Sequence, residues 1–330
     1  MKKLLMAILS VTLMLTIVTA CGNNEDTSTS TPETNTNAQD STNTGSENTG
    51  SANTGSENTS NDSSADSSGS NDTSNFDADR IIAVFTREEG SGTRDAFVST
   101  TGVGDDMYIE AVVVSETNEL LTKVEESEHA IGYVSVGSLS DRVKALSISG
   151  VIPSDETIKD GTYTIQRPLL VCVNEQNAQN DIVNDFIDFM LSAQGQAVSS
   201  TRWTAIDDNA PQYSPSGLSG TIRVGGSTSV DPLMQGLRQA YIALNPNVQI
   251  EISGGGSGTG ISEATSGVIE MGMSSRALRD NEKEALADIT IALDGVAIIV
   301  NPANPMTDIT TEQVREIFTG EITRWTDLVG

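Results

Sequence analysis

The chain has 330 residues, with 46 acidic and 18 basic side chains and a formal net charge of −28. This charge excludes the basic face that a nucleic-acid-binding domain needs, but local donors can still hold a small anion, because surface charges are screened beyond about 8 Å. The length suffices for two ordinary domains, and the single histidine, His129, excludes a zinc site built from several histidines. No metal and no cofactor is expected.

The first residues have the pattern of a targeting segment. Lys2 and Lys3 precede an apolar run over residues 4–18, which is short for a membrane span and typical of a secretory signal. The run ends in Val-Thr-Ala-Cys-Gly and is similar to a bacterial lipoprotein signal, in which Cys21 becomes the lipid-modified anchor. Residues 1–21 are therefore predicted to be a lipoprotein signal peptide, with the protein on the extracellular face of a Gram-positive cell membrane. The alternative is an ordinary signal peptide with an incidental cysteine.

Residues 22–78 have the composition of a linker. Ser, Thr, Asn, Gly, Asp and Glu make up almost all of this segment, and the heptapeptide 43–49 recurs at 53–59. Such a composition buries too little apolar surface to fold, so a disordered tether is expected. By the square-root rule for flexible chains it would span about 40 Å.

The folded region opens with a strand, a glycine turn and a helix. The apolar run Ile81–Phe85 is followed by Arg-Glu-Glu-Gly-Ser-Gly-Thr-Arg at residues 87–94, and a helix is predicted to begin near Ser91. This layout directs free backbone N–H groups at an anion, and an arginine can grip two of its oxygens. The hydroxyls of Ser91 and Thr93 add donors. The stretch indicates a site for a small tetrahedral oxyanion; the alternative is a plain strand–turn–helix connection with a surface arginine.

Further strands and helices alternate up to residue 206. His129 precedes a predicted strand and is interpreted as structural, and Cys172 lies within a strand and is interpreted as core. Residues 207–220 are rich in Pro, Ser, Gly and Asn and are predicted to form a connector. The expected elements are a strand ending at 114, a helix over 118–126, strands over 130–136, 143–148 and 168–173, and a helix over 181–192.

The second half alternates in the same way. Strands are expected over 222–226, 248–252, 269–273 and 289–300, the last interrupted by Asp294-Gly295, with helices over 231–244, after the loop 254–260 and over 311–318. The pattern predicts an α/β fold with mostly parallel sheets, in which ligands bind beyond the carboxyl ends of the strands. Four strand ends carry small hydroxyl residues that can converge there, at 91–93, 227–229, 257–259 and 274–275.

Five motifs resemble the substrate-binding lipoproteins of bacterial phosphate ABC importers. They are Gly226-Ser-Thr-Ser-Val-Asp-Pro232, Gly254-Gly-Gly-Ser-Gly-Thr-Gly260, Met271-Gly-Met-Ser-Ser-Arg276, Phe318-Thr-Gly-Glu-Ile-Thr-Arg-Trp325 and the stretch at 87–94. The resemblance implies a two-lobed periplasmic-binding-protein fold of type II, with two mixed sheets flanked by helices around a central cleft. It also implies a monomer that closes on phosphate without catalysis, and a permease and an ATPase subunit of an importer as partners.

The resemblance also implies the site residues. Ser275 stands where some members of the family have an aspartate that accepts the proton of hydrogen phosphate. This difference leaves open which group of this chain would accept that proton. Glu88 and Glu89 are expected to balance Arg87 rather than touch the ligand. The implied phosphate-binding residues are Thr228, Ser229, Ser257 and Ser275 in one lobe and Arg87, Ser91, Gly92 and Thr93 in the other.

The order of the motifs departs from the family's pattern. There the Gly-Ser-Thr-Ser segment comes first, whereas here it follows the connector 207–220, so a circular permutation is predicted. The alternatives are a truncated gene product or a fragment of a tandem array. The prediction places residues 79–142 with 301–330 in lobe II and residues 143–300 in lobe I, and it requires Gly330 to lie close to Arg80.

The sequence leaves three functional hypotheses open. The leading prediction is an extracellular phosphate receptor that feeds an ABC-type importer. The second is a phosphate-sensing or surface-interaction module without a transport role. The third is a secreted hydrolase with Ser91 or Ser257 as nucleophile, which is disfavoured because no histidine or lysine motif stands beside either serine.

Overall fold

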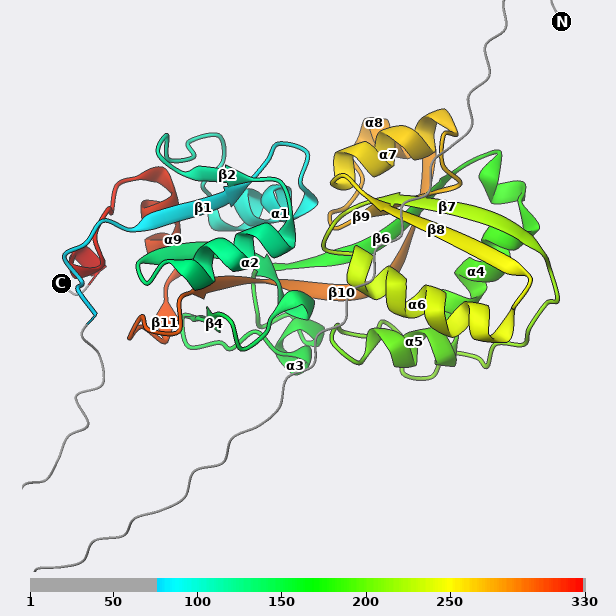
Figure 1. Ribbon diagram of the computed structural model, residues 1–330, viewed down its shortest axis with the longest axis horizontal. Coiled ribbons are helices and arrows are strands. Elements are labelled where there is room, and N and C mark those ends of the chain that lie inside the picture. Colours follow the sequence, from blue (N-terminus) through cyan, green and yellow to red (C-terminus); the bar gives the residue numbers. More distant parts are fainter. Residues whose placement is uncertain (1–75, 329–330) are drawn as a thin grey trace, which may run out of the picture. The chain divides into compact units, whose positions relative to one another are not determined.

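The computed structural model describes residues 76–328, and the predicted signal peptide and the predicted linker up to residue 75 lie outside them (Figure 1). The first half comprises β1 (Ala83–Arg87), α1 (Gly92–Thr101), β2 (Val112–Val114), α2 (Thr117–Glu126), β3 (Ala130–Ser135), β4 (Lys144–Ala145), β5 (Ser147–Ile148), α3 (Asp155–Lys159), β6 (Gln166–Asn174), α4 (Asp181–Leu191) and α5 (Ala193–Ser199). The second half comprises β7 (Gly220–Gly226), α6 (Asp231–Leu244), β8 (Val248–Gly254), α7 (Ser257–Ser266), β9 (Met271–Ser274), α8 (Asp280–Lys283), β10 (Leu286–Val300), β11 (Asp308–Ile309) and α9 (Thr311–Thr319). None of the described helices has both the length and the apolar character that crossing a membrane requires.

One hydrogen-bonded path of strands runs through the folded region in the order β2-β1-β3-β10-β6-β9-β7-β8. The two ends of this path, β2-β1-β3-β10 and β6-β9-β7-β8, have the same arrangement of strands. β1 pairs in parallel with β2 and β3, and β7 pairs in parallel with β8 and β9. An antiparallel strand then follows in each half, β10 beside β3 and β6 beside β9. The α/β fold with mixed strand directions is confirmed, but the two expected sheets share β10 and form one continuous path.

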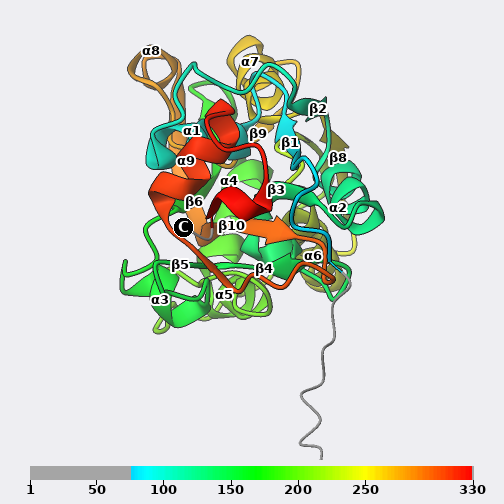
Figure 2. The same ribbon diagram turned by 90° about the vertical axis from the view of Figure 1, so that its left-hand side faces the viewer.

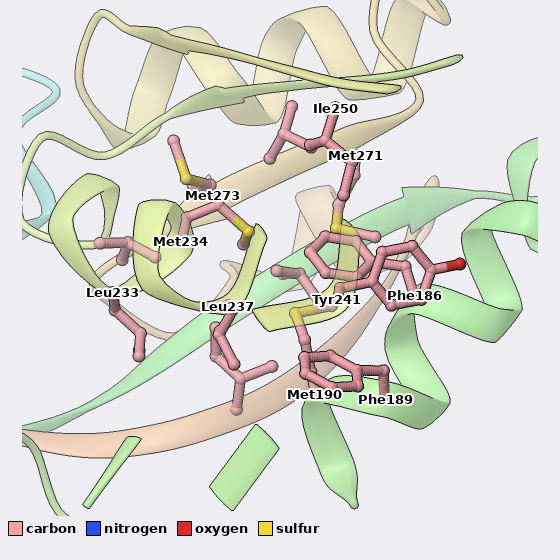
Figure 3. Close-up of a cluster of buried hydrophobic side chains, with 14 of the residues drawn as sticks. Phe186, Phe189, Met190, Leu233, Met234, Leu237, Tyr241, Ile250, Met271 and Met273 are labelled. Atoms are coloured by element: carbon pink, nitrogen blue, oxygen red, sulfur yellow. The ribbon is translucent and has the colours of Figure 1, made fainter. Parts of the chain in front are cut away.

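The two largest clusters of buried side chains define two lobes, seen on the left and right of Figure 1. The core of lobe II gathers around β1, β3, α1 and α9 and includes stacked Phe97 and Tyr133, whose ring centroids lie 4.0 Å apart. The core of lobe I lies between α4, α6 and the strands, where Phe186 packs on Tyr241 at 4.8 Å (Figure 3). Each fully buried aromatic or aliphatic side chain of this kind stabilises the fold by about 1.5–3 kcal/mol.

The chain crosses between the lobes in β6 and in β10, which pair antiparallel. Ile165 and Val296 pack in the core of lobe II, whereas Leu169 and Ile291 pack in the core of lobe I. The crossings therefore fall near residue 166 and near residue 294.

These crossings correct the predicted boundaries. Residues 143–165 and 295–300 pack with lobe II, although the sequence assigned them to lobe I. The sequence-based boundaries stood at the ends of predicted strands. The chain instead changes lobe inside two strands, because β10 is 15 residues long and supplies a strand to both halves.

A buried ion pair sits at the crossing. Arg167 and Asp294 lie opposite each other in β6 and β10, with side chains only 2% and 1% exposed. The Arg167 Nε and Nη2 donate to Asp294 Oδ2 at 3.1 and 2.9 Å. The predicted interruption of the last long strand at Asp294-Gly295 is thus wrong. The strand continues through Asp294 because Arg167 on the adjacent strand matches its buried charge.

The start and the end of the described region lie side by side, as the cyan and red segments of Figures 1 and 2 show. The Ile82 N–H donates to the Thr323 carbonyl at 2.9 Å, and the Thr326 N–H donates to the Ala78 carbonyl at 3.1 Å. Gly330 itself lies outside the described residues.

The connector 207–220 is fixed to lobe I by Tyr213. Its hydroxyl donates to Asp185 at 2.7 Å and accepts from the Asn245 side chain at 2.8 Å. Its backbone N–H and carbonyl both bond the Gln194 amide. The connector therefore packs on α4, α5 and the end of α6.

Candidate functional site

Arg87, at the end of β1, is the charged centre of a polar cluster between the lobes. Its side chain is 2% exposed, and it donates from Nε and Nη2 to the two carboxylate oxygens of Glu88 at 2.9 and 3.0 Å. The Arg87 N–H donates to the Tyr133 hydroxyl at 3.1 Å, and burial raises the pKa of Tyr133 to about 12, so this phenol stays neutral. Glu88 therefore orients and balances the guanidinium, as the sequence predicted.

The terminal nitrogens of the Arg87 guanidinium lie near hydroxyls of both lobes. Arg87 Nη2 lies 3.2 Å from the Thr228 Oγ1, and Nη1 lies 3.3 Å from the Thr117 Oγ1. Nη2 also donates to the Ser115 carbonyl at 2.9 Å. The two threonine hydroxyls are themselves 3.2 Å apart, across the boundary between the lobes.

A second bridge joins the start of α1 to the loop after β7. The Thr93 and Ser229 hydroxyls lie 2.8 Å apart, and the Ser229 N–H donates to the Ser227 hydroxyl at 3.3 Å. Both hydroxyl residues of the bridge are almost fully buried. Hydroxyls that bond each other in this way can also turn toward a ligand, because each is both donor and acceptor.

Three serines of lobe I complete the cluster. Ser227 donates to the Ser275 hydroxyl at 2.9 Å, and the Ser257 and Ser275 hydroxyls are 3.3 Å apart. The Ser275 N–H donates to the Ser257 hydroxyl at 3.1 Å. All three are no more than 2% exposed.

Helix starts supply further donors. α1, α6 and α7 begin next to these hydroxyls, at Gly92, Asp231 and Ser257. The first N–H groups of a helix have no partner within it, and the positive end of its dipole favours an anion. The residues before α6 and α7, Val230 and Gly256, provide no side-chain cap, whereas Ser91 caps α1 by accepting from the Arg94 N–H.

Gly92 allows the lobes to approach closely. A Cβ on this residue would lie 2.4 Å from the Ser257 Oγ and 2.7 Å from the Ser275 Oγ. The first turn of α1 thus lies against the serines of the other lobe with no room for a side chain.

The hydrogen bonds of this cluster within residues 76–328 include one carboxylate, Glu88, and both of its oxygens already accept from Arg87. The remaining groups are hydroxyls, backbone N–H groups and the guanidinium. Within the same residues, no three His, Cys, Asp or Glu side chains are placed to hold a metal ion. The arrangement suits a small oxyanion held by neutral donors and one arginine.

The structure brings together the eight residues expected at the site, with Ser91 serving as the cap of α1 rather than as a bridge between lobes. Glu89 differs from its predicted role, since its carboxylate pairs with Arg94, at 3.9 Å, and not with Arg87. Thr117 was missed, whereas Ser227 lies in the hydroxyl stretch 227–229 that was expected to converge on the ligand but was not among the implied phosphate-binding residues. Thr117 follows a strand of only three residues and stands in no glycine motif. The strand arrangement that repeats at the two ends of the sheet could have pointed to it.

The buried position expected for Cys172 is confirmed, and burial raises the pKa of its thiol to about 12. His129 packs on the ring of Phe76 with centroids 4.8 Å apart, which agrees with a structural role.

Comparison with known proteins agrees with this geometry. A model of the PBP superfamily domain matches residues 28–194 and 211–330. The phosphate-binding protein PstS 2 of Streptococcus agalactiae serotype V is 39% identical over 257 residues, which cover 75% of this chain and 87% of that protein. A crystal structure of the phosphate-binding protein of a phosphate ABC transporter from Streptococcus pneumoniae TIGR4 matches with a TM-score of 0.63 and 37% identity, over 76% of this chain and 100% of that one. The phosphate-binding protein PstS of Bacillus subtilis is 34% identical over 115 residues, 34% of this chain and 38% of that protein.

The two lobes and the polar cluster between them are thus those of a binding protein of the PBP superfamily, to which the chain belongs. Within that superfamily its family is that of the phosphate-binding proteins named PstS.

Proposed function

We propose that this protein binds inorganic phosphate outside the cell and delivers it to an ABC-type importer. The observation that carries the proposal is the donor set that the lobes form together, one arginine with neutral hydroxyl and N–H groups, in a chain of the PstS family. Neutral donors suit a dianion because they bring no counter-charges that must be desolvated with it.

Each lobe would supply part of the grip. From lobe II, the Arg87 guanidinium binds two phosphate oxygens, and the Gly92 and Thr93 N–H groups at the start of α1 bind a third. From lobe I, the hydroxyls of Thr228, Ser257 and their neighbours turn from each other to the ligand. Neither lobe offers the whole set, so the anion is fully coordinated only when the lobes are together.

The site would bind without catalysis. The hydroxyl of Ser91 caps α1, and that of Ser257 bonds Ser275. Neither contact supplies the general base that an activated serine nucleophile needs. A hydrolase therefore finds no support in this geometry.

The targeting segment completes the proposal. Cys21 would carry the lipid anchor, and residues 22–78 would tether a monomeric binding domain to the outer face of the membrane, next to the permease and ATPase subunits of the importer. Support comes from the lipoprotein-like pattern of the first residues.

Titration calorimetry of the wild-type protein with phosphate and with sulfate tests the function. We expect saturable phosphate binding without turnover, and we expect Arg87→Ala to weaken it roughly a hundredfold, since two charge-assisted hydrogen bonds are lost and Glu88 is left facing the ligand. Arg94→Ala is the matched control, because Arg94 stands in the same motif and its ion pair within residues 76–328 is with Glu89. No heat with either anion, or an Arg87→Ala variant that binds like wild type, would refute the proposal.

A further inference from the structure

An ionic bridge joins the two lobes beside the polar cluster. Asp95, in the first turn of α1 in lobe II, has its Oδ2 2.8 Å from the Arg276 Nε and 2.9 Å from the Arg279 Nη2 of lobe I. Arg276 is buried, with 8% of its side chain exposed, whereas 62% of Arg279 is exposed. One carboxylate oxygen thus meets two arginines across the boundary between the lobes.

The lobe I half of this bridge is held in place independently of Asp95. Glu282 accepts from both terminal nitrogens of Arg276, at 2.7 and 2.8 Å, and from the Arg279 N–H at 2.7 Å. If the lobes separate, Arg276 keeps a bidentate partner within its own lobe. Only the contacts with Asp95 are lost, so the bridge can open and re-form without leaving a buried arginine unpaired.

The bridge lies at the edge of the site rather than in its donor set. A cavity of about 450 Å³ and another of about 490 Å³ are both lined by Asp95, Arg276 and Arg279, so the bridge borders both cavities. Nearby, the Gly258 N–H donates to the Gly90 carbonyl across the same boundary at 3.0 Å. None of these groups belongs to the proposed phosphate grip.

We propose that Asp95 is a latch: a positioning residue that holds the lobes closed and so slows the release of the bound anion. The apparent dissociation constant of a two-state binding protein equals the intrinsic constant divided by the fraction in the binding-competent state. A contact made only in the closed state raises that fraction without touching the ligand. The effect on phosphate affinity rests on the proposed function, whereas the effect on closure does not.

Closure is tested first, without any ligand. Pulsed electron paramagnetic resonance measures the distance between one spin label on α9 and one on α4 in the full-length protein. We expect Asp95→Asn to shift the population toward longer distances and Asp95→Glu to restore part of the short-distance population. The control is Glu312→Gln, which also removes an acid from the first turn of a helix and an ion pair, with Arg315, but within one lobe.

Release is tested with inorganic phosphate by stopped-flow fluorescence. For a partly buried carboxylate with two arginine partners we expect Asp95→Asn to raise the dissociation rate constant about tenfold, with the association rate constant little changed, and Arg279→Gln to raise it about threefold. The double variant should release phosphate no faster than Asp95→Asn alone, because Arg279 donates its side-chain hydrogen bond to Asp95.

An unchanged distance distribution together with an unchanged release rate in Asp95→Asn would overturn the latch. If the wild-type protein bound no phosphate, the proposed function would fail, and the distance distribution alone would decide about the latch.

Discussion

At the scale of single residues, Gly92 is a position where the space between the two lobes leaves no room for a side chain. An alanine at this first position of α1 would suit the helix, since alanine is a better helix former than glycine. Its Cβ would nevertheless meet the Ser257 and Ser275 hydroxyls of the other lobe at 2.4 and 2.7 Å. We therefore expect Gly92→Ala to keep or raise the melting temperature of the ligand-free protein while lowering phosphate affinity at least tenfold. Calorimetric scanning and titration on one sample measure both, and a variant that lost stability but kept its affinity would show that the glycine serves the fold instead.

The residues of the site were predictable to the extent that they follow a glycine or serine motif at a strand end. Arg87, Thr228 and Ser257 all stand in such motifs, and their convergence follows from the rule that ligands lie beyond the carboxyl ends of strands. Thr117 stands in none, and the pairing of Asp95 with Arg276 joins residues 181 positions apart with no shared pattern. Contacts across the boundary between lobes depend on how the lobes meet, which local sequence does not encode.

At the scale of elements, the short helix α8 stabilises the end of β9 through one carboxylate. The hydrogen bonds from Arg276 hold the pKa of Glu282 below its ordinary value, against the opposing effect of burial. A lowered carboxyl pKa means that the stabilisation is present above the unfolded-state value, about 4.3, and is lost as the pH falls through the folded-state value. We expect Glu282→Gln to lower the free energy of unfolding by about 1 kcal/mol at pH 7 and by much less at pH 3. Urea unfolding at both pH values checks this, and an equal difference at both would contradict it.

The longer elements followed from periodicity, and the exceptions have physical causes. α4 was predicted with nearly its observed bounds because its buried residues recur at helical spacing and pack on α6 (Figure 3). α5 was missed because it has only seven residues, three of them buried and none of these apolar and large. β10 was divided at Asp294, since its partner Arg167 is 127 residues away in sequence and supplies the counter-charge.

At the scale of the whole molecule, the order of the two halves supports a circular permutation, which remains our proposal. The 257 residues matched by the Streptococcus agalactiae protein exceed the length of either half, so that relative carries the halves in the order seen here. The Bacillus subtilis match of 115 residues has the length of about one half, as expected if the halves are exchanged there. The hydrogen bonds between residues near 78 and near 326 show that the two ends of the described region are already adjacent.

The permutation predicts that the ends can be joined and the connector opened. The backbone contacts Ile82–Thr323 and Ala78–Thr326 hold the two ends of the described region side by side, so a Gly/Ser linker of about four residues would span the gap. New termini between Asn209 and Ala210 would leave the anchors of Tyr213 intact. Tyr213 would stay joined to β7 and would keep its three partners, Asp185, Gln194 and Asn245.

We expect this rearranged chain to melt within about 5 °C of the unrearranged residues 76–330, because only loop-closure entropy and no packed contact has changed. Phosphate should bind with the same affinity within about twofold, since the lobes still cross at β6 and β10 and meet at the same polar cluster. Opening the chain instead between Arg167 and Pro168 is the informative contrast. That cut falls inside β6 beside the buried Arg167–Asp294 pair and interrupts the pairing of β6 with β10, which joins the two lobes. If the connector variant failed to fold while this second variant folded and bound phosphate, the fold would require an intact connector. That result would contradict the permutation hypothesis.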